Sequence, residues 1–275
     1  MLKKTNIFLF IILSILGLVV LNLQNETETV SRTLLTIDPS QIQTIHIETP
    51  ENRIFLLKVD KHWKIDLGMN NARKLLHADK WRIEQLLSLT QQADFELVNS
   101  VDYHKFGLAT PHASVQFNDI KVIYGNNHDI SRRRYIQIGQ QIFLIRDKIY
   151  RHLIEETSQY LSKSLIPPDV EIGAILTPTI SVIRNNQHWQ AIPPMLSTDM
   201  LQIFLNEWRL ATAHRVEFGN APATAEVVQI DLQDDQQITY NVQRTEENTI
   251  FSRSDIKLHY FISQQTAAKL ISIDQ

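Results

Sequence analysis

Histidine is the residue type in this chain that could most readily do chemistry. Neutral imidazole is a common metal ligand and a general base near neutral pH. No two histidines stand in an H-x-x-x-H or H-E-x-x-H pair, the spacing that aims two ligands from one helix face. His104 and His112 flank Gly107, and His128 lies in a predicted loop, so these three could meet in space. Without ligand spacing, we predict no metal site. The ten histidines are His46, His62, His77, His104, His112, His128, His152, His188, His214 and His259.

Other catalytic chemistries lack their motifs. The chain has no cysteine, which excludes thiolate catalysis, disulfides and cysteine metal clusters. None of its 7 glycines forms a G-x-G pair, and a phosphate cradle needs glycines where the backbone approaches the phosphate. No G-x-S-x-G elbow of a serine hydrolase is present. We therefore predict no catalytic, cofactor-binding or metal-binding residues, no cofactor, and a protein that is not an enzyme.

Two charge clusters have ordinary explanations. Arg132-Arg133-Arg134 precedes a predicted strand, and we expect a solvated loop or a guarded edge strand. The alternative is contact with anionic lipid or an acidic partner, although a lipid patch needs about 4–8 basic residues. Asp231, Asp234 and Asp235 surround a predicted hairpin turn and lack the alternation of a calcium loop. The net charge of -3 argues against nucleic-acid binding, which favours basic domains.

The N-terminus has the pattern of a membrane anchor. Lys3 and Lys4 precede an apolar run from Ile7 to Leu21, and about 17 apolar residues suffice for a spanning helix. The lysines should stay in the cytoplasm, which exports the remainder. We expect a cytoplasmic tail at 1–6, a transmembrane anchor at 7–23 and a tether at 24–40, in a bacterial inner membrane with the body in the periplasm. The alternative, a cleaved signal peptide, lacks a small-x-small site here.

The rest of the chain reads as an internal duplication. His62-Trp63 recurs as His188-Trp189, each after a short strand. An amphipathic helix follows each, and then strands in the same order. Both halves end on an apolar strand that runs into a helix. The predicted strands are 53–59, 95–98, 114–117 and 143–147 in the first half and 179–184, 214–218, 227–230 and 260–264 in the second; the helices are 78–91, 148–154, 198–210 and 265–271.

These elements predict an α+β fold of two similar subdomains after the N-terminal helix. Alternating strands and helices with one apolar face suit an antiparallel sheet with helices packed on it. Pro167-Pro168 forbids a continuous helix between the halves. We place the first repeat at 41–168 and the second at 169–275. Trp81 and Trp208 fall within the predicted helices, and we expect them in the core. An exposed aromatic groove for a partner or glycan is the alternative.

The first half resembles a known family. Gly107-Leu108-x-x-Pro111 precedes a strand, Tyr124-Gly125, the strand at Tyr135–Ile138 and the strand at Ile142–Ile145. This order is similar to the bacterial domain of unknown function family DUF4340, over about residues 54–168. The second half lacks the Gly-Leu-x-x-Pro element.

The resemblance implies a single-anchor envelope protein, in some cases an accessory to an ABC-type export system. It brings no catalytic residues. We therefore expect a periplasmic accessory or interaction protein whose partners are the inner membrane and a membrane complex such as an ABC-type exporter, with no nucleic acid. Two alternatives stay open: a module that binds envelope polysaccharide, and a hydrolase with an unrecognised site. An aromatic-lined pocket would favour the first, and a cleft with convergent His and Asp/Glu side chains would favour the second.

Overall fold

The computed structural model describes most of the chain after the tether begins. The described residues are 33–68, 73–168, 170–186, 188–194, 196–222, 226–233 and 236–272. The predicted tail, the anchor and the tether up to residue 32 lie outside them. Within the described ranges, no helix has the length and hydropathy needed to cross a membrane.

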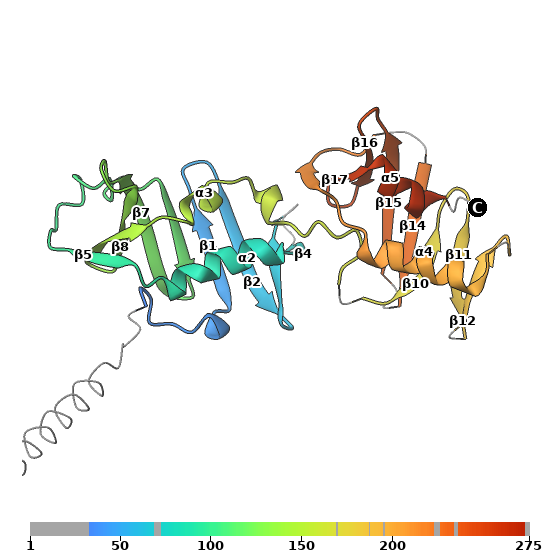
Figure 1. Ribbon diagram of the computed structural model, residues 1–275, viewed down its shortest axis with the longest axis horizontal. Helices are drawn as coiled ribbons and strands as arrows, with labels where there is room; N and C mark the ends of the chain where they lie inside the picture. The colour runs from blue at the N-terminus through green and yellow to red at the C-terminus, as the bar shows by residue number, and fades with distance from the viewer. Residues whose placement is uncertain are drawn as a thin grey trace, which may run out of the picture.

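The described part of the first half forms one antiparallel sheet in the order β4-β3-β2-β1-β6-β7-β8-β9-β5 (Figure 1). Burial alternates along β1, as a sheet with one covered face requires, whereas β6 and β9 are buried along most of their length. They are β1 (Thr44–Glu48), β2 (Arg53–Val59), β3 (His62–Asp66), β4 (Leu75–His77), β5 (Phe95–Val98), β6 (Ala113–Phe117), β7 (Ile120–Asn127), β8 (Arg133–Ile138) and β9 (Gln141–Arg146).

The second half forms another antiparallel sheet in the order β12-β11-β10-β14-β15-β16-β17-β13. Setting β4 aside, the two orders correspond strand for strand, so both sheets have one connectivity. The fold is therefore two antiparallel sheets with few helices. The strands are β10 (Ile172–Leu176), β11 (Ser181–Asn185), β12 (His188–Ile192), β13 (Arg215–Phe218), β14 (Glu226–Leu232), β15 (Gln237–Arg244), β16 (Asn248–Arg253) and β17 (Leu258–Ser263).

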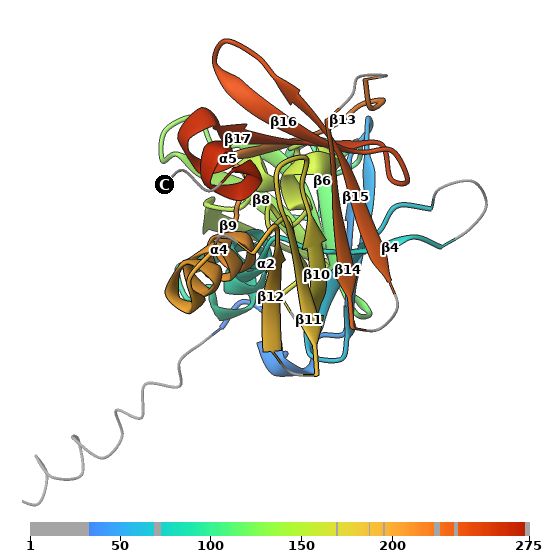
Figure 2. The ribbon, with the colours of Figure 1, turned by 90° about the vertical axis from the view of Figure 1, so that its right-hand side faces the viewer.

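Each sheet carries its longest helix on the same side of the molecule. Helices α2 and α4 lie in front of their sheets in Figure 1, and both lie on the same side in the end-on view of Figure 2. The predicted helix at 198–210 is confirmed, and the one at 78–91 is α2 followed by a 3-10 turn. The helices are α2 (Lys80–Leu87), α3 (Tyr150–Leu153), α4 (Thr198–Leu210) and α5 (Gln264–Ile271), with 3-10 turns η1 (Pro39–Gln41), η3 (Ser88–Gln91) and η4 (Thr157–Tyr160).

Local capping explains where the helices begin. Asp79 accepts a hydrogen bond from the backbone N–H of Arg82 at 2.9 Å and starts α2. Ser197 accepts one from Met200 at 3.2 Å and starts α4. Both satisfy backbone donors that have no partner within the helix.

The helical tryptophans divide between core and surface. Trp208 is 0% exposed and donates its indole N–H to the carbonyl of Leu270 at 3.0 Å, which confirms its predicted core position. Trp81 is 50% exposed, so the prediction of a core role was wrong. The buried stripe of α2 holds Ile83 and Leu86, and Trp81 lies two residues from Ile83, about 200° around the helix axis.

The repeated His-Trp pairs begin strands. Trp63 and Trp189 are the second residues of the equivalent strands β3 and β12. Both are half-buried against the apolar core. His188 is exposed, because an edge strand places its side chain outside the packed face.

The segment between the sheets is hydrogen-bonded to both. Ser162 N–H donates to the carbonyl of His77 at 2.8 Å on the first side. Leu165 N–H donates to Ala211 at 3.1 Å, and Tyr240 donates its hydroxyl to Leu165 at 2.5 Å on the second. One apolar cluster contains buried residues of both halves. These bonds hold the two sheets at a fixed junction.

Candidate functional site

The Gly107 turn folds back over one face of the first sheet. Gly107 has φ +70°, a conformation that glycine adopts without strain. The N–H of Asn126 donates to the carbonyl of Phe106 at 2.8 Å, which fixes the turn against β7. Phe106, Leu108 and Ile142 form a small apolar cluster separate from the main core. The Gly107-Leu108-x-x-Pro111 element therefore covers one end of the first sheet.

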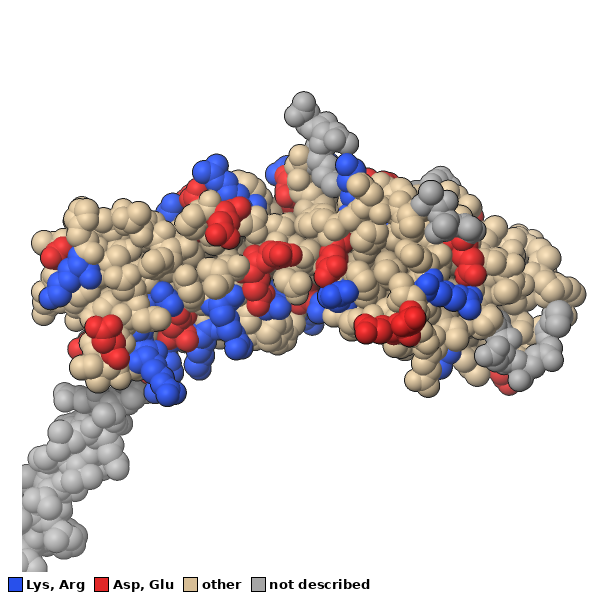
Figure 3. All heavy atoms as spheres, turned by 90° about the horizontal axis from the view of Figure 1, so that it is seen from above, with Lys and Arg blue, Asp and Glu red and all other residues tan. Residues whose placement is uncertain are grey.

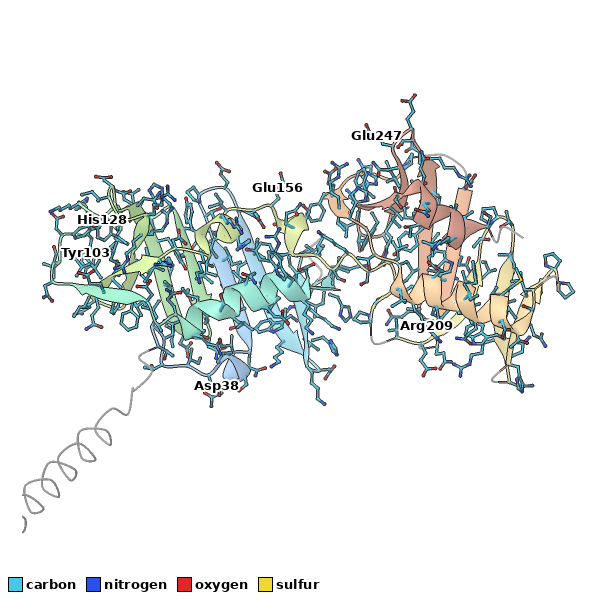
Figure 4. The ribbon with its side chains drawn as sticks, viewed as in Figure 1. Asp38, Tyr103, His128, Glu156, Arg209 and Glu247 are labelled. Atoms are coloured by element: carbon cyan, nitrogen blue, oxygen red, sulfur yellow. The ribbon has the colours of Figure 1, made fainter. Side chains whose placement is uncertain are left out.

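A pocket of about 680 Å³ lies beneath this turn. Such a volume is typical of small-ligand sites. Figure 4 places His128 and Tyr103 at this end of the first sheet. The lining residues are Lys105, Phe106, His112, Asn126, Asn127, His128, Asp129, Ile130, Arg134, Tyr135 and Tyr150.

Buried Arg134 organises the pocket wall. Its Nε donates to Asp147 at 2.6 Å and its Nη1 to the carbonyl of Gly125 at 2.6 Å. The guanidinium lies 3.6 Å from the ring centroid of Tyr150. Asp147 in turn accepts from the backbone N–H of Tyr150 at 2.9 Å. The arginine thus ties β8, β7 and α3 together.

The expectation of a solvated or edge arginine cluster was wrong for two of its three members. Strand β8 pairs with β7 on one side and β9 on the other, so it is not an edge. Arg134 is buried, and Arg133 pairs with Asp94 at 2.9 Å and with Glu96 at 3.3 Å. Arg132 is exposed, with φ +53°. Alternation along the strand sends neighbouring arginines to different surroundings.

The core beside this wall contains a tyrosine hydroxyl without a partner. Tyr124 is 0% exposed, and its hydroxyl is a buried polar atom that makes no hydrogen bond. Burial raises the pKa of Tyr124 well above its ordinary value, and the charge of Asp147 raises it further. Tyr124 therefore stays a neutral phenol.

Two of the three histidines near the Gly107 turn reach the pocket. His112 and His128 line it, while His104 is not among its lining residues. His112 Nε2 lies 3.0 Å from Asn126 Oδ1, and His128 Nδ1 lies 3.1 Å from Ser131 Oγ. Over the described ranges, no three His, Asp or Glu side chains are grouped closely enough to hold a metal ion. Asp234 and Asp235 lie outside those ranges, and Asp231 accepts from Gln237 at 2.9 Å.

Two histidine contacts arise from tertiary pairing and have no signal in the sequence. His259 Nδ1 lies 2.7 Å from Ser252 Oγ, across β17 and β16. Burial lowers the pKa of His259, and the charge of Glu217 partly opposes this. Ser252 is 0% exposed, so no substrate can reach its hydroxyl as a nucleophile. The hydrogen bond is partly buried and links two neighbouring strands.

The second contact lies beside α2. Arg82 Nη1 lies 2.6 Å from His152 Nδ1 and 2.5 Å from a Glu155 carboxylate oxygen. The Trp81 ring meets the His152 ring edge-on with centroids 5.4 Å apart. Burial lowers the pKa of His152, Glu155 opposes this, and the charges of Arg82 and Arg151 lower it further.

Two further hollows lie away from the Gly107 turn. A cleft of about 510 Å³ is lined by both halves, including Lys64, Lys74 and Arg253. Asp255 accepts from Lys74 at 3.2 Å and from Arg253 at 2.7 Å, so two of these cations share one carboxylate. A more apolar groove lies between α4 and α5 and is lined by Met200, Ile203, Phe204, Glu207, Gln265, Ala268, Lys269 and Ser272.

No family model, no curated protein and no solved structure matches this chain. The description of the candidate site therefore rests on its geometry.

Proposed function

We propose that this chain is a membrane-anchored envelope accessory protein that acts by contact with a partner protein. The single observation that carries the proposal is a second apolar stripe on α4. The helix buries Leu201, Phe204, Leu205 and Trp208 against its sheet, and that stripe is all that packing requires. Ile203 and Leu210 are nonetheless 61% and 79% exposed.

The exposed stripe borders the apolar groove between α4 and α5. Met200, Ile203, Glu207 and Leu210 are spaced by three or four residues and so share one side of the helix. Glu207 pairs with Lys269 of α5 at 3.2 Å, which gives the groove a polar edge. An apolar centre with a charged rim is the composition of a protein interface.

The first half contributes a further exposed apolar residue to the proposed partner surface. Exposed Trp81 lies on α2, on the same side of the molecule as α4 (Figures 1 and 2). The Arg82 guanidinium lies 4.9 Å from the Trp81 ring centroid. Tryptophan and arginine are the residues most enriched among interface hot spots. One side of both halves therefore offers the partner surface.

The N-terminal segment determines where this surface acts. Residues 7–23 would hold the body at the inner membrane, facing the periplasm, because Lys3 and Lys4 favour the cytoplasm. Confinement near a membrane raises the local concentration of a weak partner. The family resemblance implies a membrane complex such as an ABC-type exporter as that partner. Alkaline phosphatase fused after the C-terminus should be active, and an inactive fusion would refute this topology.

Site-directed photo-crosslinking tests the contact itself. A photoreactive residue at Ile203 in the full-length membrane-bound protein should give one discrete crosslinked product. Val101, which is 79% exposed on the first half, serves as the matched control position and should give none. Ile203→Glu should abolish capture of the same product while leaving the melting temperature unchanged, because the side chain is already largely solvated. Equal crosslinking at both positions, or none at Ile203, would refute the proposed surface.

A further inference from the structure

The strand β12 forms an open edge of the second sheet. Over the described residues it pairs only with β11. Its sequence, His188-Trp189-Gln190-Ala191-Ile192, contains no Lys, Arg, Asp or Glu. Figure 1 places β12 at the end of the second half that lies away from the first half, and this end is mostly uncharged in the view of Figure 3. An uncharged edge of this length is the kind to which a further strand pairs.

The other edge strands of the described sheets are protected. Strand β13 carries Arg215 and Glu217, and strand β5 carries Glu96. Strand β4 is only three residues long, and Ala78 directly after it is bridged to Leu161. Charged side chains, short strands and covering segments are the usual protections of an edge. Strand β12 has none of the three.

The first half shows the equivalent edge in a paired state. Strand β12 corresponds to β3, because both are the outer strands of equivalent hairpins and both begin with His-Trp. On the outer side of β3, strand β4 pairs antiparallel and sets Leu76 opposite Ile65. Residues 67–79 join β3 to α2 and supply that strand, whereas only residues 193–197 join β12 to α4. The second half therefore has the edge but lacks the strand that covers it.

The backbone groups on the open side of β12 can be identified from β3. The N–H of Ala78 donates to the carbonyl of Trp63 at 2.8 Å, so the backbone of Trp63 faces the outer side of β3. Trp189 is the equivalent residue of β12, and the side to which the backbone bonds alternates along an antiparallel strand. Trp189 and Ala191 therefore have their N–H and C=O groups on the open side. Within the described part of the chain, neither bonds to a backbone group there.

These positions fit a second copy of β12 that is related by a two-fold axis at Gln190. In an antiparallel pair about that axis, Trp189 lies opposite the partner's Ala191, and the two residues exchange both backbone hydrogen bonds. A large ring then stands opposite a small side chain, and no like charges meet. An axis at Trp189 would set two indole rings opposite each other. An axis at Ala191 would set Trp189 opposite Pro193, which has no N–H to donate.

We propose that two copies of this chain associate through their β12 edges, which joins their second sheets into one continuous antiparallel sheet. The two-fold axis is perpendicular to that sheet, so α4 of both copies lies on the same side. The anchor proposed at residues 7–23 would confine both copies to one surface and raise their local concentration. The pairing uses β12 and not the exposed stripe of α4, so it stands or falls separately from the proposed partner surface.

Cysteine crosslinking of the full-length protein in membranes tests the pairing. The chain has no cysteine of its own, so one introduced thiol reports on one position. Gln190 is exposed, and Cβ atoms of directly opposite residues lie about 4.5–5.5 Å apart. Gln190→Cys should therefore give a disulfide-linked dimer on mild oxidation. Gln243→Cys is the matched control, because Gln243 is an exposed glutamine on β15, which pairs on both sides. No dimer at Gln190, an equal yield at Gln243, or a product with the mass of one chain plus a different protein would overturn the proposal.

A charge exchange distinguishes a second copy from any other strand. Gln190→Lys and Gln190→Glu each set like charges opposite one another at the axis, and each should weaken self-association by about fivefold or more. Sedimentation of the full-length protein in detergent measures this. A mixture of the two variants sets opposite charges there and should restore association. Because Gln190 is exposed, the melting temperature of each variant should stay unchanged.

Gln243→Lys is the control for the charge exchange and should leave association unchanged. Undiminished association of Gln190→Lys, no recovery in the mixture, or an equal loss with Gln243→Lys would each overturn the proposal.

Discussion

Arg134 and Asp147 form a buried ion pair, with the arginine Nε 2.6 Å from the carboxylate. The pair joins the middle of the first sheet to the start of α3, since Asp147 also accepts from the backbone of Ile149 and Tyr150. A buried charge is tolerated only when it is paired and its hydrogen bonds are satisfied. In β16 of the second half, Thr249 pairs with Ile262 in the register that Arg134 has with Ile145, so no arginine stands at the equivalent position.

Removing one partner of this pair should destabilise the protein strongly. Asp147→Asn leaves the Arg134 charge buried without its counter-ion, and we expect a loss of about 3–5 kcal/mol in the free energy of unfolding. Urea denaturation of the full-length protein measures it. Asp94→Asn is the control, because the Arg133–Asp94 pair lies at the surface and should contribute less than about 1 kcal/mol. Similar losses in both variants would contradict the structural assignment.

A pair of glycine substitutions separates backbone strain from crowding. Gly107 and Gly139 both have positive φ, +70° and +57°. An added Cβ at Gly139 meets nothing within 4 Å, whereas at Gly107 it lies 2.4 Å from Asn126 Oδ1. Gly139→Ala should cost about 1–2 kcal/mol from left-handed strain alone. Gly107→Ala should cost more, and should also displace Asn126. Equal decreases in melting temperature for the two variants would contradict this ranking. They would show that the Asn126 side chain moves aside without a cost in stability.

The tryptophans should differ in their contribution to stability. Trp208→Ala removes a fully buried ring and the hydrogen bond to Leu270, and should cost about 3–5 kcal/mol. Trp63→Ala and Trp189→Ala should each cost clearly less, because both rings are only half-buried. Chemical denaturation of the three variants tests the ranking. A loss at Trp63 as large as at Trp208 would contradict it.

Much of the fold follows from the sequence because its signals are local. The helix at 198–210 has its cap at Ser197 and an apolar stripe of Leu201, Phe204, Leu205 and Trp208, and the structure places its bounds and the core position of Trp208 as predicted. The order of strands in a sheet depends on pairing between residues far apart in the sequence. The matching order of elements in the two halves nevertheless predicted that the two sheets would correspond.

The candidate pocket could not be predicted in the same way. Phe106, Asn127 and Tyr135 come from a turn and two strands, and their meeting depends on strand register. Trp81 has an ordinary helical setting in the sequence, and only the position of Ile83 and Leu86 on the sheet shows that it faces outward. Arg134 likewise cannot be distinguished from its two arginine neighbours until its pairing partner Asp147 is placed.

Acid should destabilise the protein partly through His152. Burial lowers the pKa of His152 in the folded state, against the pull of Glu155, and its Nδ1 is 2.6 Å from an Arg82 donor, which requires that nitrogen unprotonated. In the unfolded chain the pKa is about 6.5. As the pH falls below that value, the unfolded state binds a proton that the folded state resists, so the free energy of unfolding decreases.

The stabilisation is therefore fully present above about pH 6.5 and is lost as the pH falls towards the lowered folded-state pKa. His152→Gln keeps an acceptor for Arg82 but cannot be protonated, so its free energy of unfolding should fall less steeply over this range. His259, whose pKa burial also lowers, contributes a slope of the same sign, and His259→Gln should remove its share. Urea unfolding at about pH 7.5 and about pH 5.5 spans the window, because the two values bracket the unfolded-state pKa. If His152→Gln loses as much stability as the unmodified protein between these pH values, protonation of His152 is not part of the acid response.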